Sequence, residues 1–280
     1  MKTYFECIPC FMQQALRASE VTNCDDSLTH KILAETGKMI ADIPLESTPP
    51  ETGRLIYQKV SELTNIQDPY YEIKQKNINH VQQLYPKLKK IINESENQLL
   101  TAVRLAIAGN VIDLGVNREF DILQAIDDIL IQDFAYNDFD KFSQAVANAQ
   151  NILYLADNSA EAVFDKLLIE QMGKHVIFAV KEKPIINDAT IKEAKQIGIS
   201  EIADVISSGS DAPGTILDLC NEEFLEIFKN ADLIISKGQG NFEGLSDVKA
   251  PIFFLLRAKC PVIAKELEVE VDSIILKSQE

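Results

Sequence analysis

Residues 152–158 read Ile152-Leu153-Tyr154-Leu155-Ala156-Asp157-Asn158, a run of five apolar residues followed at once by two polar ones. An apolar run of this length, bounded by polar residues, is typical of a buried strand. A helical pattern follows over 160–172, and a second strand-like run, 175–180, precedes a second helical pattern over 190–197. Strands that alternate with helices predict an α/β fold with a mostly parallel sheet covered on both faces.

The chain before about residue 150 has helical periodicity, and Pro86 interrupts one helical run, which predicts a kink or a break there. We therefore predict an all-α region over 1–150 and an α/β domain over 151–280, with no obvious linker between them. Beyond the first two strands, the apolar runs predict further strands at 203–206, 233–236, 252–255, 262–264 and 273–276.

The composition predicts a soluble, globular protein, because hydrophobic residues make up 46% of the 280 and suffice for a core. The formal net charge of −16 repels phosphate backbones, so a nucleic-acid partner is not expected. No apolar stretch is long enough to span a bilayer, and the N-terminus lacks a secretory signal pattern. Five scattered cysteines argue against a disulfide framework. We expect a cytoplasmic protein with no membrane partner.

Polar residues follow the first two predicted strands of the sheet. Asp157 and Asn158 end the first strand, and Asn187 and Asp188 follow the second. Oxygen ligands of this kind suit Mg²⁺, Mn²⁺ and similar ions, and ligands of parallel sheets bind at the carboxyl ends of strands. Each pair also suits helix capping, since Asn158 precedes Glu161 by three residues, as in a capping box. Two such junctions on one rim favour a site over caps alone.

Two later junctions are rich in glycine. The segment 207–215 contains two glycines with serines and a threonine, which would suit either an anion-binding turn or a plain surface turn. The segment Ser236-Lys237-Gly238-Gln239-Gly240-Asn241-Phe242-Glu243 places a lysine at a strand tip, before backbone that can approach a ligand closely. Its third glycine, Gly244, falls one residue late for a dinucleotide fingerprint, so a nicotinamide cofactor is not expected.

Two further motifs lie in the helical part. Asn110 and Asp113 interrupt an apolar helix after Gly109, and taken alone they favour a helix end over a reach toward the sheet. Cys7-Ile8-Pro9-Cys10 is half of a zinc site, and Cys24 and His30 are spaced as in no common zinc finger. Buried thiols are therefore the favoured interpretation of this motif.

Taken together, these segments resemble the damage-control phosphatase family, which is also labelled acidic-residue methyltransferase-like. They occur in the family's order over nearly the whole chain, and the N-terminal C-x-x-C is similar to that of the stand-alone archaeal and bacterial branch. The matching pieces are Cys7-x-x-Cys10 with Gln14, Gly109-Asn110-x-x-Asp113, Ala156-Asp157-Asn158-x-x-Glu161, Lys181-x-x-Pro184-x-x-Asn187-Asp188-Ala189, Gly209 through Gly214-Thr215, Lys237-Gly238-Gln239-Gly240-Asn241-Phe242-Glu243 and Lys259-Cys260.

The resemblance implies a helical N-terminal region packed on a Rossmann-like, three-layer α/β/α core. It places the family's metal ligands on Asp157, Asn158 and Asp188, and its phosphate-contacting lysine on Lys237. It implies hydrolysis of a small phosphorylated metabolite, such as a sugar phosphate or a damaged phosphometabolite, with Mn²⁺, Co²⁺, Ni²⁺ or Mg²⁺. One departure is Ala160, where similar sequences often carry glycine.

The mechanism expected from these residues is phosphate-ester hydrolysis at a metal site. Asp157 acts as a metal ligand, or also as nucleophile or base, while Asn110 and Asp113 orient a ligand or the substrate. Lys237 holds a phosphoryl oxygen, and Glu161 belongs to the same phosphate-binding set, together with Gly238, Gly240 and Asn241. The first junction has no glycine, which disfavours the methyltransferase alternative, and a metal-binding module without turnover stays open.

Overall fold

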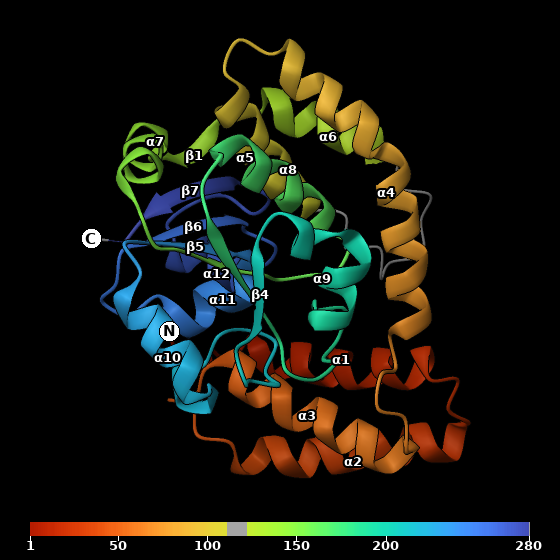
Figure 1. Cartoon of the computed structure of the whole chain (residues 1–280). Coiled ribbons are helices and arrows are strands. Elements are labelled where there is room, and N and C mark those ends of the chain that lie inside the picture. Colours follow the sequence, from red (N-terminus) through yellow and green to blue (C-terminus); the bar gives the residue numbers. More distant parts are fainter. Residues whose placement is uncertain (111–121, 280) are drawn as a thin grey trace.

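The computed structural model of the chain describes residues 1–110 and 122–279. The chain begins with a group of three helices, which lies at the bottom of Figure 1, and a long fourth helix leads from it to the rest of the molecule. The helices before the first strand are α1 (Cys7–Val21), α2 (Asp26–Asp42), α3 (Pro49–Thr64), α4 (Tyr71–Glu94), α5 (Gln98–Gly109) and α6 (Ile122–Ile131).

A seven-stranded sheet forms the centre of the protein, in the order β1-β7-β6-β5-β2-β3-β4. All neighbouring strands are parallel except β6 and β7, which are antiparallel. The strands are β1 (Phe134–Asn137), β2 (Ile152–Leu155), β3 (Val176–Val180), β4 (Asp204–Ser207), β5 (Leu233–Lys237), β6 (Ile252–Arg257) and β7 (Ile274–Ser278). The connecting helices are α7 (Phe139–Asn148), α8 (Ala162–Met172), α9 (Ile191–Ile197), α10 (Glu222–Asn230), α11 (Gly238–Leu245) and α12 (Pro261–Glu266).

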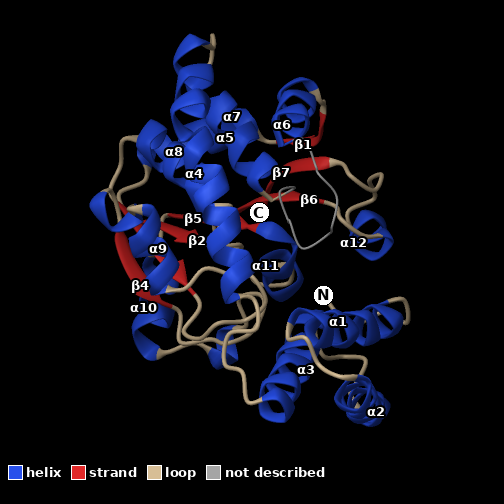
Figure 2. Ribbon diagram, turned by 90° about the vertical axis from the view of Figure 1, so that its right-hand side faces the viewer, coloured by secondary structure: helices blue, strands red, loops and turns tan. Residues whose placement is uncertain are grey.

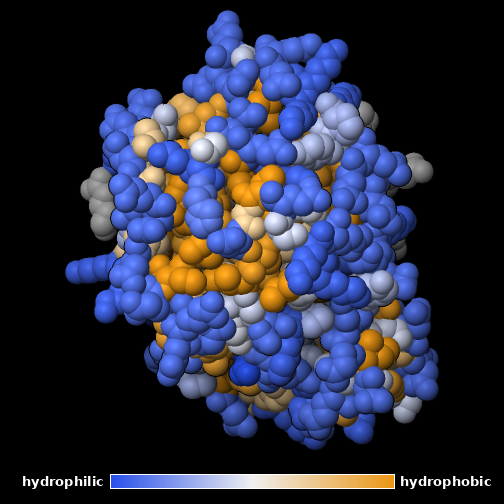
Figure 3. Space-filling model, in the orientation of Figure 1, coloured by the Kyte–Doolittle hydropathy of each residue, from blue (hydrophilic) through white to orange (hydrophobic). Residues whose placement is uncertain are grey.

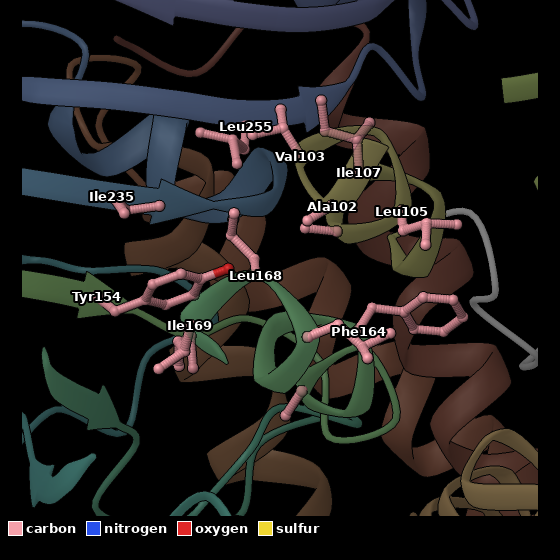
Figure 4. Close-up of a cluster of buried hydrophobic side chains, with 14 of the residues drawn as sticks. Ala102, Val103, Leu105, Ile107, Tyr154, Phe164, Leu168, Ile169, Ile235 and Leu255 are labelled. Atoms are coloured by element: carbon pink, nitrogen blue, oxygen red, sulfur yellow. The ribbon is translucent and has the colours of Figure 1, made fainter. Parts of the chain in front are cut away.

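Helices cover both faces of the sheet. Side chains alternate in direction along each strand, so apolar residues face the helices on either side. In β2, Ile152 and Tyr154 enter a core with α4, α5, α8 and α9, and Figure 4 shows part of it. Leu153 and Leu155 enter the opposite core with α10, α11, α12 and the N-terminal helices, which Figure 2 shows on the other side of the strands. The predicted α/β fold, with a mostly parallel sheet between helical layers, is confirmed.

Three local expectations differ from the structure. The predicted strand at 262–264 is wrong: these residues lie in α12, since Pro261 stands at a helix start and three apolar residues have no readable period. A short strand, Phe134–Asn137, lies in the part predicted to be all helical, and it pairs with β7. Helix α4 continues through Pro86, so the expected break is wrong, while a kink there stays a prediction. The division at residue 150 stays a prediction, although β1 and α7 precede it.

The order of the strands creates a switch point between β2 and β5. The chain proceeds from β2 to β3 and β4 on one side, and then returns to β5 on the other side of β2. The connections therefore leave these two neighbours in opposite directions, and a crevice forms beyond their carboxyl ends, where open α/β sheets bind ligands. Asp157 and Gly238 follow these two strands.

One edge of the sheet, at β4, lies at the surface of the protein. In Figure 3, hydrophobic side chains gather over the sheet beside β4, whereas hydrophilic side chains cover the surrounding helices. Strand β4 is an edge strand, and three of its four residues are half-buried. Among the described residues, none of the helices has the length and apolar character needed to cross a bilayer.

We expect replacement of Pro86 by alanine to stabilise the protein. Proline inside a helix loses one backbone hydrogen bond and crowds the preceding turn, at a cost of about 3 kcal/mol, while its removal frees the unfolded chain by up to about 1 kcal/mol. Urea unfolding should therefore show a gain of about 2 kcal/mol for Pro86→Ala. The neighbouring exposed variant, Lys87→Ala, should stay within about 0.5 kcal/mol of wild type. Equal stability of all three proteins would contradict this account.

Candidate active site

Asp157 lies at the switch point, directly after β2, and is 8% exposed. Its Oδ2 atom accepts hydrogen bonds from Asn110 Nδ2 at 2.8 Å and from Asn158 Nδ2 at 3.2 Å. Gly238, with φ of +78°, lies so close that a Cβ atom there would overlap the Asp157 carboxylate. A residue without a side chain is needed at this point for the carboxylate to keep its place.

The second polar junction lies beside the first, as the sequence predicts. Asn158 and Asp188 form an isolated antiparallel β-bridge. The Ser159 hydroxyl donates to the carbonyl oxygens of Asn187 and Asp188, at 2.8 and 2.9 Å. Ile186, just before them, has a φ of +46°, which is strained for a β-branched residue. Such strain persists only where the surroundings hold it, and it often occurs at functional sites.

Asn110 both ends α5 and reaches the sheet. It is the C-cap of the helix and is fully buried, and its Nδ2 atom donates to Asp157 and, at 2.9 Å, to Glu161 Oε2. The two interpretations of this motif are therefore compatible, because a short side chain at a helix end can point onward. Asp113, the other residue predicted here, lies outside the described residues.

Lys237 is fully buried and does not line the cavity of the site. Its ammonium donates to Glu161 Oε1 at 2.5 Å, to Asp165 Oδ1 at 2.6 Å and to the Ala106 carbonyl at 2.9 Å. Burial would lower the pKa of Lys237, but the two carboxylates outweigh it and raise the pKa. The lysine is therefore charged, and its three N–H groups donate hydrogen bonds to these three acceptors.

Asn241 and the glycines hold the chain behind the site. Asn241 Nδ2 donates to the carbonyl oxygens of Lys237 and Ala156, at 2.7 and 3.1 Å, and so joins α11 to β2. Gly240 lines the cavity, and a side chain there would collide with the Pro213 carbonyl. Of the predicted phosphate-binding residues, the structure brings Gly240 to the cavity and places Asn241, Gly238 and Glu161 behind it.

A cavity of about 420 Å³ opens at this rim of the sheet. Asp157, Asn158 and Asp188, the three predicted metal ligands, all line it. The N-terminal helical group forms the opposite wall, and this contribution was not predicted. The wall residues from this group are Glu6, Cys7, Cys10, Phe11, Gln14, Pro49, Pro50 and Gly53.

Several polar residues of the cavity were not predicted as site residues. Lys259 is exposed there, and its charge opposes the rise in the pKa of Asp157. Glu243 and Gln239 line the same wall, and Gln239 Nε2 donates to Glu243 at 2.9 Å. Lys259 and Glu243 stand in motifs of the resemblance, which was the available signal. The sequence pattern does not tell whether the side chains of Lys259 and Glu243 point into the cavity.

Three thiols also line the cavity. Cys7 and Cys10 come from α1, and Cys260 comes from the loop before α12. Cys7 is buried, as the motif favours, whereas Cys10 is exposed, so the expectation of buried thiols is wrong for Cys10. Desolvation raises the pKa of both thiols, so they stay protonated near neutral pH. Neither Cys24 nor His30 is among the residues that line the cavity. Cys260 thus lines the same cavity as the C-x-x-C motif, although it lies more than two hundred residues away in sequence.

The site holds more buried negative charge than positive charge. Four buried carboxyl groups, of Asp157, Glu161, Asp165 and Asp188, face the two buried ammonium groups of Lys181 and Lys237, an excess of two negative charges when all are ionised. Burial, and then the neighbouring Glu161, raises the pKa of Asp157 to about 6. Burial also raises the pKa of Asp165 to about 7, against the attraction of Lys237.

This excess fits a divalent cation. Among the described residues, no group of three Cys, His, Asp or Glu side chains is arranged to hold a metal ion. The predicted set is of another kind, with two carboxylates and one amide. The amide nitrogen of Asn158 donates to Asp157 and Glu161, which leaves its oxygen as the atom available to a hard cation.

The geometry and the sequence agree with one family. The family model described as the damage-control phosphatase ARMT1-like domain matches residues 3–275, and the chain belongs to this family. The resemblance inferred from the motifs is therefore confirmed.

Relatives are similar along the whole chain. A damage-control phosphatase of Pyrococcus horikoshii is 37% identical over 98% of this chain and 97% of its own. One of Archaeoglobus fulgidus is 31% identical over 97% of each chain. The crystal structure of a DUF89 family protein from Pyrococcus horikoshii has a TM-score of 0.91 at 35% identity and covers 100% of both chains. The likeness thus includes the N-terminal helices as well as the sheet.

The raised carboxylate pKa values predict how the metal-free protein responds to pH. Asp157, Asp165 and Glu243, with pKa values of about 6, 7 and 7, keep protons in the fold that the unfolded chain releases. Because the folded state then binds more protons, the free energy of unfolding should fall as pH rises from 5.5 to 7.5. Urea unfolding with EDTA at the two pH values measures this difference.

Glu243→Gln should shrink that difference by about 1 kcal/mol, since it removes one of the three groups and Glu243 is only partly shielded. The exposed variant Glu270→Gln should leave it unchanged. Carboxyls with a lowered pKa, such as Glu170 and Asp211, titrate below this window. A stability that rises with pH across the window would contradict the assignment.

Proposed function

We propose that the protein is a metal-dependent phosphatase that hydrolyses small phosphate esters, such as sugar phosphates or damaged phosphometabolites. One observation carries the proposal: Asp157, Asn158 and Asp188 meet in one cavity at the switch point of the sheet, amid an excess of buried negative charge. The family, whose named relatives are damage-control phosphatases, supports the reaction class.

The three residues would hold the cation through the carboxylate oxygens of Asp157 and Asp188 and the amide oxygen of Asn158. Mn²⁺, Co²⁺, Ni²⁺ or Mg²⁺ bound there would supply the Lewis acid that neutralises charge on the phosphoryl group. Asn110 orients the Asp157 carboxylate through its 2.8 Å hydrogen bond. Asp157 faces the cavity, so the same carboxylate is also the group placed to attack or to accept a proton.

In this proposal two lysines have different roles. Lys237 fixes Glu161 and Asp165 behind the site and, through Glu161, the Asn110 amide that orients Asp157. Its predicted direct contact with phosphate stays a prediction. Lys259 lines the cavity, and we assign it the electrostatic attraction of the phosphate group. The cavity volume of about 420 Å³ suits a substrate of sugar-phosphate size.

The two alternatives from the sequence differ in the observations that would favour them. A carboxyl methyltransferase binds a nucleoside methyl donor and wants a glycine-rich turn after its first strand. Here β2 is followed by Asp157-Asn158-Ser159-Ala160. A metal-binding module would bind the cation without releasing phosphate, so turnover distinguishes it from the proposed phosphatase.

Asp157→Ala should abolish most phosphate release while leaving the fold intact. We expect a loss on the order of a thousandfold in kcat/KM, because a metal ligand and a candidate reacting group disappear together. The assay follows phosphate release from p-nitrophenyl phosphate and a panel of sugar phosphates, first with EDTA and then with each metal restored. Asp204→Asn, at an exposed carboxylate on β4, should match wild type. Near-normal activity of Asp157→Ala with metal would refute the site.

Lys259→Met should lower kcat/KM for phosphate esters by about tenfold to a hundredfold, since one charge-assisted contact with the phosphate is lost. Lys265→Met removes an exposed lysine of the neighbouring helix, α12, and serves as the control for net charge. Equal rates for both variants would show that Lys259 has no contact with the phosphate.

A further inference from the structure

A second, smaller pocket of about 180 Å³ adjoins the active-site cavity. The two share three lining residues, Gln14, Ile186 and Asn187, so the two spaces are adjacent. The remaining wall comes from α1, α3 and the start of α4. Its residues are Arg17, Tyr57, Tyr70 and Ile73.

Arg17 contributes a positive charge to the wall of this pocket. Its Nη2 atom is shielded from solvent, and within the described part of the chain it has no hydrogen-bond partner. A buried guanidinium nitrogen without an acceptor costs free energy, and structures keep such groups mainly where a ligand or water completes them. The pocket wall contains no Asp or Glu among the described residues, whereas the active-site cavity contains Glu6, Asp157, Asp188 and Glu243.

Neutral polar residues line the pocket together with Arg17. The rings of Tyr57 and Tyr70 meet edge to face at 6.3 Å between centroids, and both line the pocket. Burial raises the pKa of Tyr57 well above its ordinary value, so its hydroxyl remains a donor. A planar guanidinium in a pocket wall without carboxylates matches a compact anion, namely a carboxylate or a phosphate.

We propose that the Arg17 pocket binds a second anionic group of the substrate, so that the preferred substrates are phosphate esters carrying another carboxylate or phosphate. This inference rests on the proposed phosphatase site for the position of the first phosphate. The loop at Ile186 to Asn187 borders both spaces and also carries Asp188. The same short segment, which contains the strained Ile186, therefore borders both anion positions of the proposed substrate.

The test compares substrates that differ in the second anion. Glucose 6-phosphate against 6-phosphogluconate adds a carboxylate, and fructose 6-phosphate against fructose 1,6-bisphosphate adds a phosphate. Wild type should prefer the member with the second anionic group in at least one pair, and the pair identifies the group. Arg17→Met should lower kcat/KM for that member by about tenfold to a hundredfold. It should leave the other member of the pair within about threefold.

Two variants control the result. Arg17→Lys keeps the charge without the planar fork, should retain part of the preference, and serves if Arg17→Met does not fold. Lys31→Met removes an exposed charge from α2 and should change neither member of a pair. Equal losses for both members, or no loss, would overturn the pocket.

Calorimetric binding of the same four compounds separates the two proposals. Binding that depends on Arg17, in a protein that hydrolyses none of the esters with any metal, would support the pocket and refute the phosphatase. Turnover of the esters without any effect of Arg17 on rate or binding would refute the pocket and leave the phosphatase. Absence of an Arg17 effect together with absence of turnover would refute both.

Discussion

The buried ion cluster of Lys237 with Glu161 and Asp165 is the interaction on which the site depends. It joins β5 to α8, and through the Ala106 carbonyl it also holds α5. Removal of one partner of such a cluster typically costs about 3–5 kcal/mol, because the remaining charges stay buried without compensation. The cluster therefore holds β5, α8 and α5 together where the polar strand tips meet, and in this arrangement Asn110, the C-cap of α5, reaches Asp157.

The same cluster sets the electrostatics of the cavity. One ammonium faces two carboxylates, and Asp157 adds a third within reach of Asn110 and Glu161. Burial makes each additional negative charge unfavourable, so carboxyl groups of the site keep their protons near neutral pH. A bound cation would offset this cost by neutralising the ionised carboxylates. A site of this kind is less stable empty than filled, and under the proposed function cation binding and folding stability are coupled.

The sequence was informative where local pattern and chemistry coincide. The apolar runs predicted β2, β3 and β5, and the polar residues at their tips converge on one rim because parallel strands end there. It was uninformative where direction in space decides. Lys237 stands at a strand tip, but its side chain points inward rather than into the cavity. The carboxylates of Glu161 and Asp165, at the start of helix α8, attract it there. The short run 262–264 has no period that separates strand from helix, and the cavity that Cys260 shares with the C-x-x-C motif brings together residues from opposite ends of the chain.

The contribution of the N-terminal helices follows from the same limit. Nothing in the pattern of α1 or α3 indicates that Cys10, Gln14 or Pro50 faces the sheet, because amphipathic helices bury one face wherever a partner exists. In the structure these helices close the cavity that the strand tips open, and α3 is tied to the loop after β4 through Arg54 and Asp211. Under the proposed function, the rim of the sheet supplies groups suited to a phosphate and a cation, whereas the helices supply the surface that meets the rest of the substrate. Under the proposed function, changes on the helical wall alter which ester is accepted without touching the reacting groups.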